Sequence, residues 1–75
     1  MAERKVDYII EVSPLLDYTI DVWCDWRHVA EIEKIEGVDF VSHICQPWGV
    51  WIDKRYEPAD VMYEIKELLE RLTAE

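Results

Sequence analysis

The chain has 75 residues, of which 51% are hydrophobic, and its 17 acidic and 8 basic residues give a formal net charge of -9. Its length predicts one domain, residues 1–75, near the size at which a single hydrophobic core just suffices, with residues 1–4 and 73–75 frayed. The apolar content argues against a disordered chain. The negative charge repels a phosphate backbone, so we expect no direct nucleic-acid binding, whereas it would attract a basic protein surface.

The cysteine usage and the hydropathy pattern indicate a reducing, aqueous compartment. Cys24 and Cys45 are the two cysteines, and both lie in stretches that predict strands, where a small packing residue is more common than a disulfide. No apolar segment approaches the roughly 20 residues of a membrane span, or the core of a signal peptide. We therefore expect a cytoplasmic protein with no membrane contact.

Two alternating runs predict a hairpin at the start of the chain. Apolar and polar residues alternate in residues 5–12 and again in residues 18–26. Because successive strand side chains point to opposite faces, Val22 and Trp23 lie on different faces of the second strand. A proline-containing segment between the runs returns the chain. The alternative is a helix capped by Ser13, but the β-branched residues that follow fit a strand better.

A helix and a second strand pair follow. Asp25 is placed to cap this helix by accepting from its first free amides, and Gly37 ends it in the left-handed conformation. Residues 38–45 predict a third strand, residues 46–49 a tight turn, and residues 50–54 a fourth strand. The apolar stripe of the helix consists of Trp26, Val29, Ala30, Ile32 and Ile35.

The last helix is the clearest element in the sequence. Pro58 suits its first position, and Asp60 suits its first turn, near the positive end of the helix dipole. Apolar residues recur at helical spacing and predict a buried stripe, opposite a solvated face that includes Glu67 and Glu70. The stripe consists of Val61, Ile65, Leu68 and Leu72, joined by Met62 and Leu69, and we expect Leu68 to lie against the inward face of the sheet.

The element order predicts an α+β fold of the form ββαββα. A right-handed crossover through the first helix places the fourth strand parallel beside the second, which gives a four-stranded, mostly antiparallel sheet in the order 1-2-4-3. Both helices then cover one face, in a circular permutation of the ferredoxin-like arrangement. The strand residues expected to face the helices are Tyr8, Ile10, Ile20, Val22, Phe40, Ile44, Val50 and Ile52.

One junction in the chain resembles a known type of domain. The segment from Ile35 to Val38, with Gly37 between helix and strand and Phe40 following, resembles the helix-to-strand junction of heavy-metal-associated and ACT-type regulatory domains. Both are small ferredoxin-like modules. The Cys-x-x-Cys metal-binding motif of the heavy-metal-associated family is absent from this chain, so the resemblance implies a fold and no function.

The residues suited to metal binding or catalysis form no recognised motif. Cys24, His28, His43 and Cys45 include the ligand types that bind zinc. The predicted topology places the first two and the last two at opposite ends of the sheet, so we expect neither a shared metal site nor a catalytic cysteine–histidine pair. The sequence also lacks a glycine-rich phosphate loop. We therefore predict that the protein is not an enzyme and uses no metal or other cofactor.

The sheet face that the helices leave uncovered is predicted to combine apolar and acidic side chains. On an RNA-recognition sheet such aromatic residues are accompanied by basic ones, but here the neighbours are acidic. An exposed apolar patch with an acidic rim is typical of a protein-interaction site, so we expect homodimerisation or partner binding through this face. The expected interaction residues are Trp23, Trp51, Ile9, Val41, Asp21 and Asp53.

Three alternatives remain open. The termini of the chain or a loop could cover Trp23 and Trp51. The net charge of -9 would also suit an acidic inhibitor or nucleic-acid mimic, of the type that phages use against host defence, which blocks a basic groove on a nucleic-acid-binding protein. A small-ligand regulatory domain is the third alternative, and no particular residue supports it.

Overall fold

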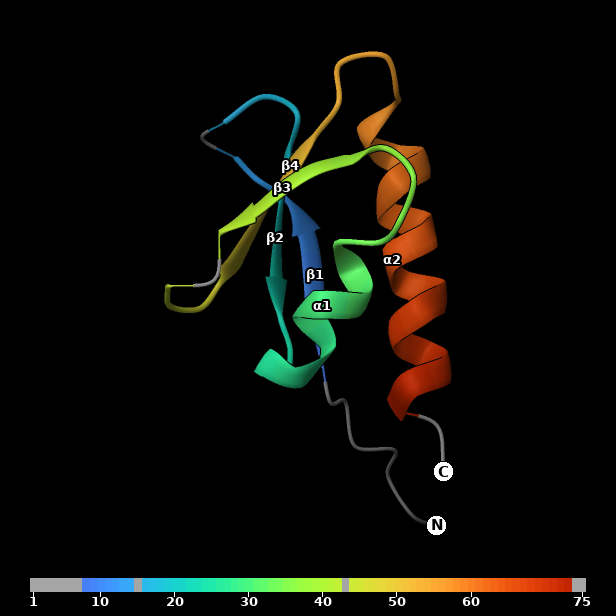
Figure 1. Cartoon of the computed structure of the whole chain (residues 1–75). Helices are drawn as coiled ribbons and strands as arrows, with labels where there is room; N and C mark the ends of the chain where they lie inside the picture. The colour runs from blue at the N-terminus through green and yellow to red at the C-terminus, as the bar shows by residue number, and fades with distance from the viewer. Residues whose placement is uncertain (1–7, 15, 43, 74–75) are drawn as a thin grey trace, which may run out of the picture.

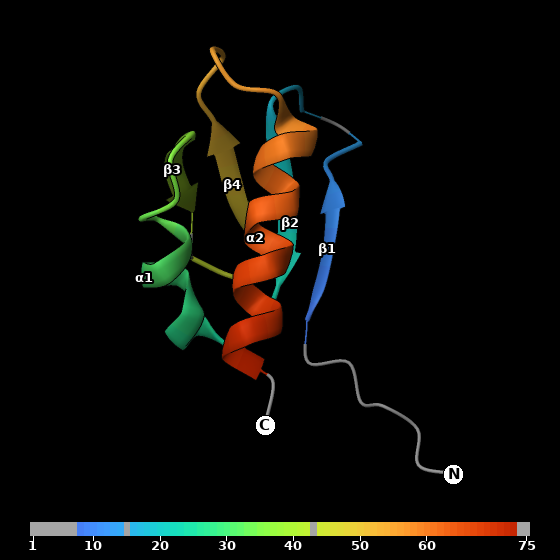
Figure 2. The same ribbon diagram turned by 90° about the vertical axis from the view of Figure 1, so that its right-hand side faces the viewer.

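The computed structural model describes residues 8–14, 16–42 and 44–73. Four strands form one sheet in the order β1-β2-β4-β3, with every neighbouring pair antiparallel. Both helices lie on the same face of this sheet (Figure 1, Figure 2). The elements are β1 (Ile9–Val12), β2 (Thr19–Trp23), the 3-10 turn η1 (Trp26–His28), α1 (Val29–Ile32), β3 (Val38–Ser42), β4 (Trp48–Ile52) and α2 (Pro58–Thr73).

The predicted α+β class, element order and strand order are confirmed, and the arrangement fits a circular permutation of the ferredoxin-like fold. The predicted direction of one strand was wrong, because β4 runs antiparallel to β2. The crossover joins β2 to β3, and a right-handed crossover makes the strands that it joins parallel. The hairpin then returns β4 between them, so β2 and β3 end at the same end of the sheet.

The first hairpin closes through contacts of Ser13. Its backbone N donates to Thr19 O at 2.9 Å, and its hydroxyl accepts from Leu16 N at 3.2 Å. A serine hydroxyl often stabilises a turn in this way, and a strand rather than a helix follows here, as predicted. Tyr18 ends the turn with a φ of 56°, in the left-handed region that residues other than glycine seldom adopt.

The segment after β2 is shorter and less regular than predicted. The predicted start is confirmed, because Asp25 accepts from Arg27 N as an N-cap. The predicted end was wrong, because α1 ends at Ile32 with Glu33 as its C-cap. Gly37 has the expected left-handed φ of 100°, but it lies in the connection that follows the helix, well after Asp25. Between them lie only the η1 turn and the four-residue α1. Trp26 was wrongly placed on the apolar stripe and is 71% exposed, because residues 26–28 form a separate turn. The stripe residues that are buried are Val29 and Ile32.

A register shift in β3 overturns one predicted face. Val38 pairs with Ile52 and Phe40 with Trp51, so Asp39 is an extra residue between two paired positions. Such a β-bulge exchanges the faces of all residues beyond it. Val41 is consequently 1% exposed and Phe40 58% exposed, the reverse of the prediction. Ile44, also predicted to face the helices, is 93% exposed because β3 ends at Ser42.

The core lies between the sheet and the helices. On α2, Val61 and Ile65 are buried as predicted, but Leu69 is buried completely where Leu68 is half-buried and Leu72 is 38% exposed. Residues four apart therefore define the buried line of this helix, and α2 extends through Thr73, which was expected to fray. The buried apolar residues are Ile20, Val22, Cys24, Val29, Ile32, Val41, Trp48, Val50, Ile52, Val61, Ile65 and Leu69.

Candidate interaction surface

The face of the sheet opposite the helices has its own set of side chains, and we call it the open face. These side chains alternate with core side chains along each strand. Two apolar pairs lie on it, Ile9 with Trp23 and Phe40 with Trp51, each formed by residues directly opposite on neighbouring strands. The open face consists of Ile9, Glu11, Thr19, Asp21, Trp23, Phe40, Ser42, Gly49 and Trp51.

The six predicted interaction residues do not all lie on this face. Val41 belongs to the core, because the bulge at Asp39 turns it towards the helices. Asp53 follows the end of β4, at the rim of the open face. The four that lie on the open face are Ile9, Asp21, Trp23 and Trp51. The structure therefore corrects the place of one residue, and the interaction role of the others stays a prediction.

The Trp51 side chain on the open face contacts two neighbouring residues. Its ring centroid lies 5.6 Å from that of Phe40 with an interplanar angle of 56°, within the tilted geometry that aromatic pairs prefer. The ring also lies over Gly49, where an added Cβ would stand 2.8 Å from the Trp51 Cζ3 atom. Trp51 remains 37% exposed and Phe40 58% exposed. The Trp51 ring thus lies against Phe40 and over Gly49, and part of it stays exposed.

A hollow of about 670 Å³ adjoins Trp51, where β4 ends and β2 begins. We call it the Trp51 hollow. Tyr18, in its left-handed conformation, is 38% exposed and forms part of the wall. The hollow is lined by Asp17, Tyr18, Asp39, Trp51, Ile52, Asp53 and Lys54. It therefore combines two aromatic side chains with three carboxylates and one ammonium group.

The carboxylates of this hollow differ in their partners. Asp53 accepts from Arg55 at backbone N (2.9 Å), Nε (3.1 Å) and Nη2 (2.8 Å), and these hydrogen bonds lower the pKa of Asp53 to about 2. Asp17 and Asp39 form no ion pair with any side chain in residues 8–14, 16–42 and 44–73. Asp39 interacts with Arg55 only at longer range, where it helps to raise the pKa of the arginine.

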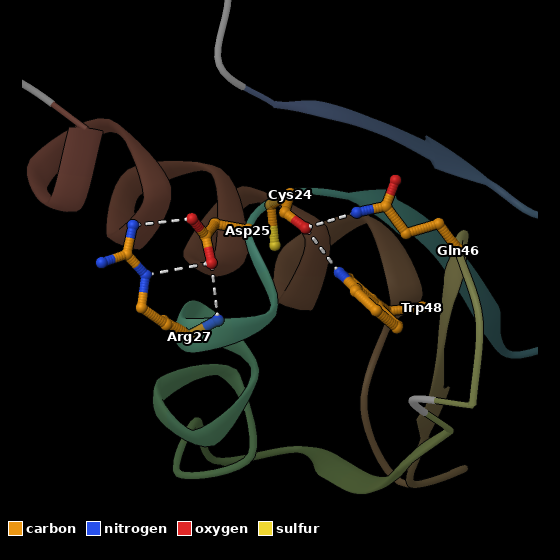
Figure 3. A network of polar contacts seen from close by, with 5 residues as sticks. All are labelled: Cys24, Asp25, Arg27, Gln46 and Trp48. Atoms are coloured by element: carbon orange, nitrogen blue, oxygen red, sulfur yellow. Dashed lines mark hydrogen bonds and ion pairs between the residues drawn. The ribbon is translucent and has the colours of Figure 1, made fainter.

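A polar network lies at the opposite end of the sheet, where β2 leads into η1 (Figure 3). The Cys24 carbonyl accepts from Gln46 Nε2 at 2.8 Å and from the Trp48 indole Nε1 at 2.7 Å. Asp25 binds Arg27 as Asp53 binds Arg55, and its pKa is likewise lowered to about 2 by these hydrogen bonds. The network ties the loop before β4 to the end of β2 and gives buried Trp48 a hydrogen-bond partner. Its role is structural.

The cysteines do not form a reactive centre in the described part of the chain. Because β2 and β3 are parallel, Cys24 and Cys45 follow strands that finish at the same end of the sheet. The prediction that the two cysteines lie at opposite ends of the sheet was therefore wrong. Cys24 is buried, and desolvation raises its pKa to about 11, which leaves it a poor nucleophile near neutral pH. Among the described residues no three His, Cys, Asp or Glu side chains are grouped to hold a metal ion, and His43 lies outside them.

The sequence reasoning missed Phe40 and the Trp51 hollow for different reasons. No local signal marks the bulge that exposes Phe40. The hollow forms from the first hairpin, β3 and the end of β4, which are far apart in the sequence. One usable signal was present, because a glycine two residues before Trp51 on the same strand face leaves room for its ring.

No protein family, no curated protein and no solved structure gives a significant match to the chain. In the described residues, neither helix combines the length and the apolar character that crossing a bilayer requires. The exposed aromatic residues of the open face and the acidic lining of the Trp51 hollow are the surface features of the described residues that bear on function.

Proposed function

We propose that the protein is a non-catalytic interaction module that binds a basic protein partner through its open face. The observation that supports this most is the exposed aromatic pair Phe40 and Trp51, on a face that the core does not need. Twelve apolar residues are buried between the sheet and the helices without any contribution from these two rings. Exposed aromatic residues with an acidic rim match the composition of protein-interaction sites, where aromatic anchors dominate binding energy.

The charge of the chain favours a different partner over a second copy. Two copies that met through their open faces would bring Glu11 and Asp21 of one near the same residues of the other. Both chains would also have a net charge of -9. Like charges brought together at an interface cost affinity, whereas a basic rim on the partner would both attract and orient it. A basic protein surface therefore complements the open face better than the open face complements itself.

The exposed side of α2 favours a second candidate function, that of an acidic inhibitor. Residues three and four apart lie on one side of a helix, and three exposed acids of α2, with a fourth just before the helix, follow this spacing. A row of carboxylates of this kind could occupy a basic groove that otherwise holds nucleic acid. The four residues are Glu57, Asp60, Glu64 and Glu67. This candidate uses the helix side of the molecule, so mutations distinguish it from the first.

The test is affinity capture from a lysate of the native organism, with a matched pair of variants. Phe40 and Tyr63 are both 58% exposed, but Phe40 lies on the open face and Tyr63 on α2. We expect Phe40→Ser with Trp51→Ser to abolish capture of the partner, and Tyr63→Ser to leave it intact. Circular dichroism of each variant confirms that it is folded.

Other results would contradict the proposal. Capture that survives the double substitution but is lost with Glu57→Gln and Glu64→Gln would move the site to α2 and support the inhibitor. Sedimentation that shows a wild-type dimer, dissociated by the double substitution, would identify the second copy as the partner. A partner displaced by nucleic acid would again support the inhibitor.

A further inference from the structure

The Trp51 hollow suggests which group of the partner enters the site, an inference that rests on the proposed function. We propose that it receives one arginine side chain from a basic segment of the partner. The guanidinium group would lie on the exposed part of the Trp51 ring and pair with the carboxylates of Asp17 and Asp39. The hollow is thus the specific pocket beside the broader aromatic contact made by Phe40 and Trp51.

The charges of the hollow define a place for one cation. Its three carboxylates face two basic groups, Lys54 in the lining and Arg55 bound to Asp53, so one negative charge is in excess. Since Arg55 occupies both carboxylate oxygens of Asp53, the excess charge lies on Asp17 and Asp39. One incoming cation would balance this excess charge. The attraction for the cation would then come from the hollow itself and not from the acidic surface as a whole.

The aromatic wall selects the kind of cation. Trp51 belongs both to the open face and to the lining of the hollow, so a segment lying on the open face reaches the hollow directly. A guanidinium group is planar and weakly hydrated, stacks on aromatic rings and pairs with carboxylates, whereas an ammonium group is a compact and strongly hydrated charge. The volume of about 670 Å³ lies within the roughly 300–1,000 Å³ range of ligand pockets and accommodates a long side chain.

The molecule has an internal control for this proposal. A second hollow, of about 350 Å³, lies on the helix side and is also acidic, with Tyr56 but no tryptophan in its wall. The Tyr56 hydroxyl there already donates to Glu36 Oε2 at 2.5 Å. Its lining consists of Ile35, Glu36, Tyr56, Asp60, Val61 and Glu64. If acidity alone decided binding, the two hollows would bind a cationic peptide equally.

The experiment is an NMR titration of the ¹⁵N-labelled full chain with the blocked tripeptide N-acetyl-glycyl-arginyl-glycinamide. The control peptide has citrulline in place of arginine, which keeps the shape and removes the charge. We expect saturable shifts of the Trp51 indole N–H signal and of the amides of Asp17 and Asp39 with the arginine peptide. We expect no saturable shift with the citrulline peptide. Equal shifts with both peptides, or none with either, would overturn the proposal.

Two double variants with the same change in net charge separate the hollow from the global field. Asp17→Asn with Asp39→Asn should weaken binding of the arginine peptide by about three- to tenfold, as expected for the loss of two partly exposed ion pairs. Asp60→Asn with Glu64→Gln should leave the affinity unchanged. Equal weakening by both variants would show that only overall charge matters and would refute the pocket.

Gly49→Ala tests the aromatic wall without altering any charge. Its added Cβ would stand 2.8 Å from the Trp51 ring and push the ring off the sheet. Weaker binding of the arginine peptide is the expected result, and unchanged binding would exclude a role for the ring position.

The failure of this inference can be told apart from the failure of the proposed function. If partner capture requires Phe40 and Trp51 but survives Asp17→Asn with Asp39→Asn, the open face binds the partner and the hollow does not take its arginine. If capture survives Phe40→Ser with Trp51→Ser, the proposed function itself is wrong.

Discussion

The two faces of the sheet show how differently one set of strands can use its apolar residues. On the face covered by helices, Ile20, Val22 and Val50 are fully buried. On the open face, Trp51 and Phe40 contact each other and are still 37% and 58% exposed. The apolar core cluster contains no residue of the open face, and Phe40 and Trp51 stay partly exposed. Substitutions on the two faces should therefore have different effects on stability.

The largest loss of stability is expected on the covered face at Leu69. This side chain is fully buried, and Leu69→Ala should lower the free energy of unfolding by about 2–5 kcal/mol. The total stability of so small a domain is only about 3–5 kcal/mol, so much of the population would unfold. Glu67→Ala, on the exposed side of α2, should change it by less than about 0.5 kcal/mol. Urea melts measure both, and equal effects would contradict the helix register.

The adjacent residues Val41 and Phe40 give the sharpest comparison of the two faces. Val41→Ala removes a fully buried side chain and should cost about 1–3 kcal/mol, whereas Phe40→Ala should cost less than about 1 kcal/mol although it removes more atoms. The same urea melts apply. A larger loss for Phe40→Ala would show that β3 lacks the bulge at Asp39.

This comparison also shows how far the sequence could predict the fold. Alternation assigned the faces of β2 and β4 correctly, with Ile20 inward and Trp51 outward. It failed in β3, because an extra residue at Asp39 reverses every face beyond it, and alternation alone contains no information on where a residue is extra. Helix spacing found the α2 stripe but misjudged which of Leu68 and Leu69 is fully buried.

The candidate site was predicted in part for a related reason. Trp51 and Trp23 lie in regular strands, so their outward placement followed from local periodicity. The Trp51 hollow depends on Tyr18 at the end of a turn and on the bulged Asp39, both of which break that periodicity. A hollow that is formed by irregular positions in separate segments can be recognised only from the tertiary structure.

The two glycines extend the comparison to the backbone. Gly37 has a φ of 100°, and an added Cβ would stand 2.9 Å from Val61 Cγ2, so Gly37→Ala should cost about 1–3 kcal/mol. At Gly49 the φ is ordinary and the obstacle is the partly exposed Trp51 ring, which can move, so Gly49→Ala should cost less than about 1 kcal/mol. Thermal melts would rank the two, and the reverse order would place the tighter packing on the open face.

Alkaline pH should weaken the covered face through Cys24. Burial raises its pKa from 9.0 to about 11, so the thiol stays protonated in the folded chain while the unfolded chain ionises. The stabilisation is complete below pH 9 and is lost as the pH rises to about 11. The free energy of unfolding should therefore fall less between pH 9 and 11 in Cys24→Ala than in the wild type. Parallel profiles would contradict the burial of the thiol.

The two cysteines should also differ in reactivity. Exposed Cys45 should react with iodoacetamide at pH 8 before buried Cys24 does.

The smallest expected effect concerns the two aspartate–arginine pairs at opposite ends of the sheet. Asp25 and Asp53 both have a pKa lowered from 3.8 to about 2 by arginine hydrogen bonds, so their stabilising contribution is present above pH 4 and is lost as the pH falls towards 2. Arg55→Gln should raise the pKa of Asp53 towards 3.8 in an NMR titration and leave that of Asp25 near 2. Because both pairs are exposed, the change in stability should be slight.

The same variant should have a larger effect on the affinity of the Trp51 hollow for the arginine peptide. Arg55→Gln leaves Asp53 without its arginine, so the peptide should bind more strongly. An unchanged Asp53 pKa in this variant would mean that Arg55 does not neutralise it, and that the excess charge of the hollow is not confined to Asp17 and Asp39.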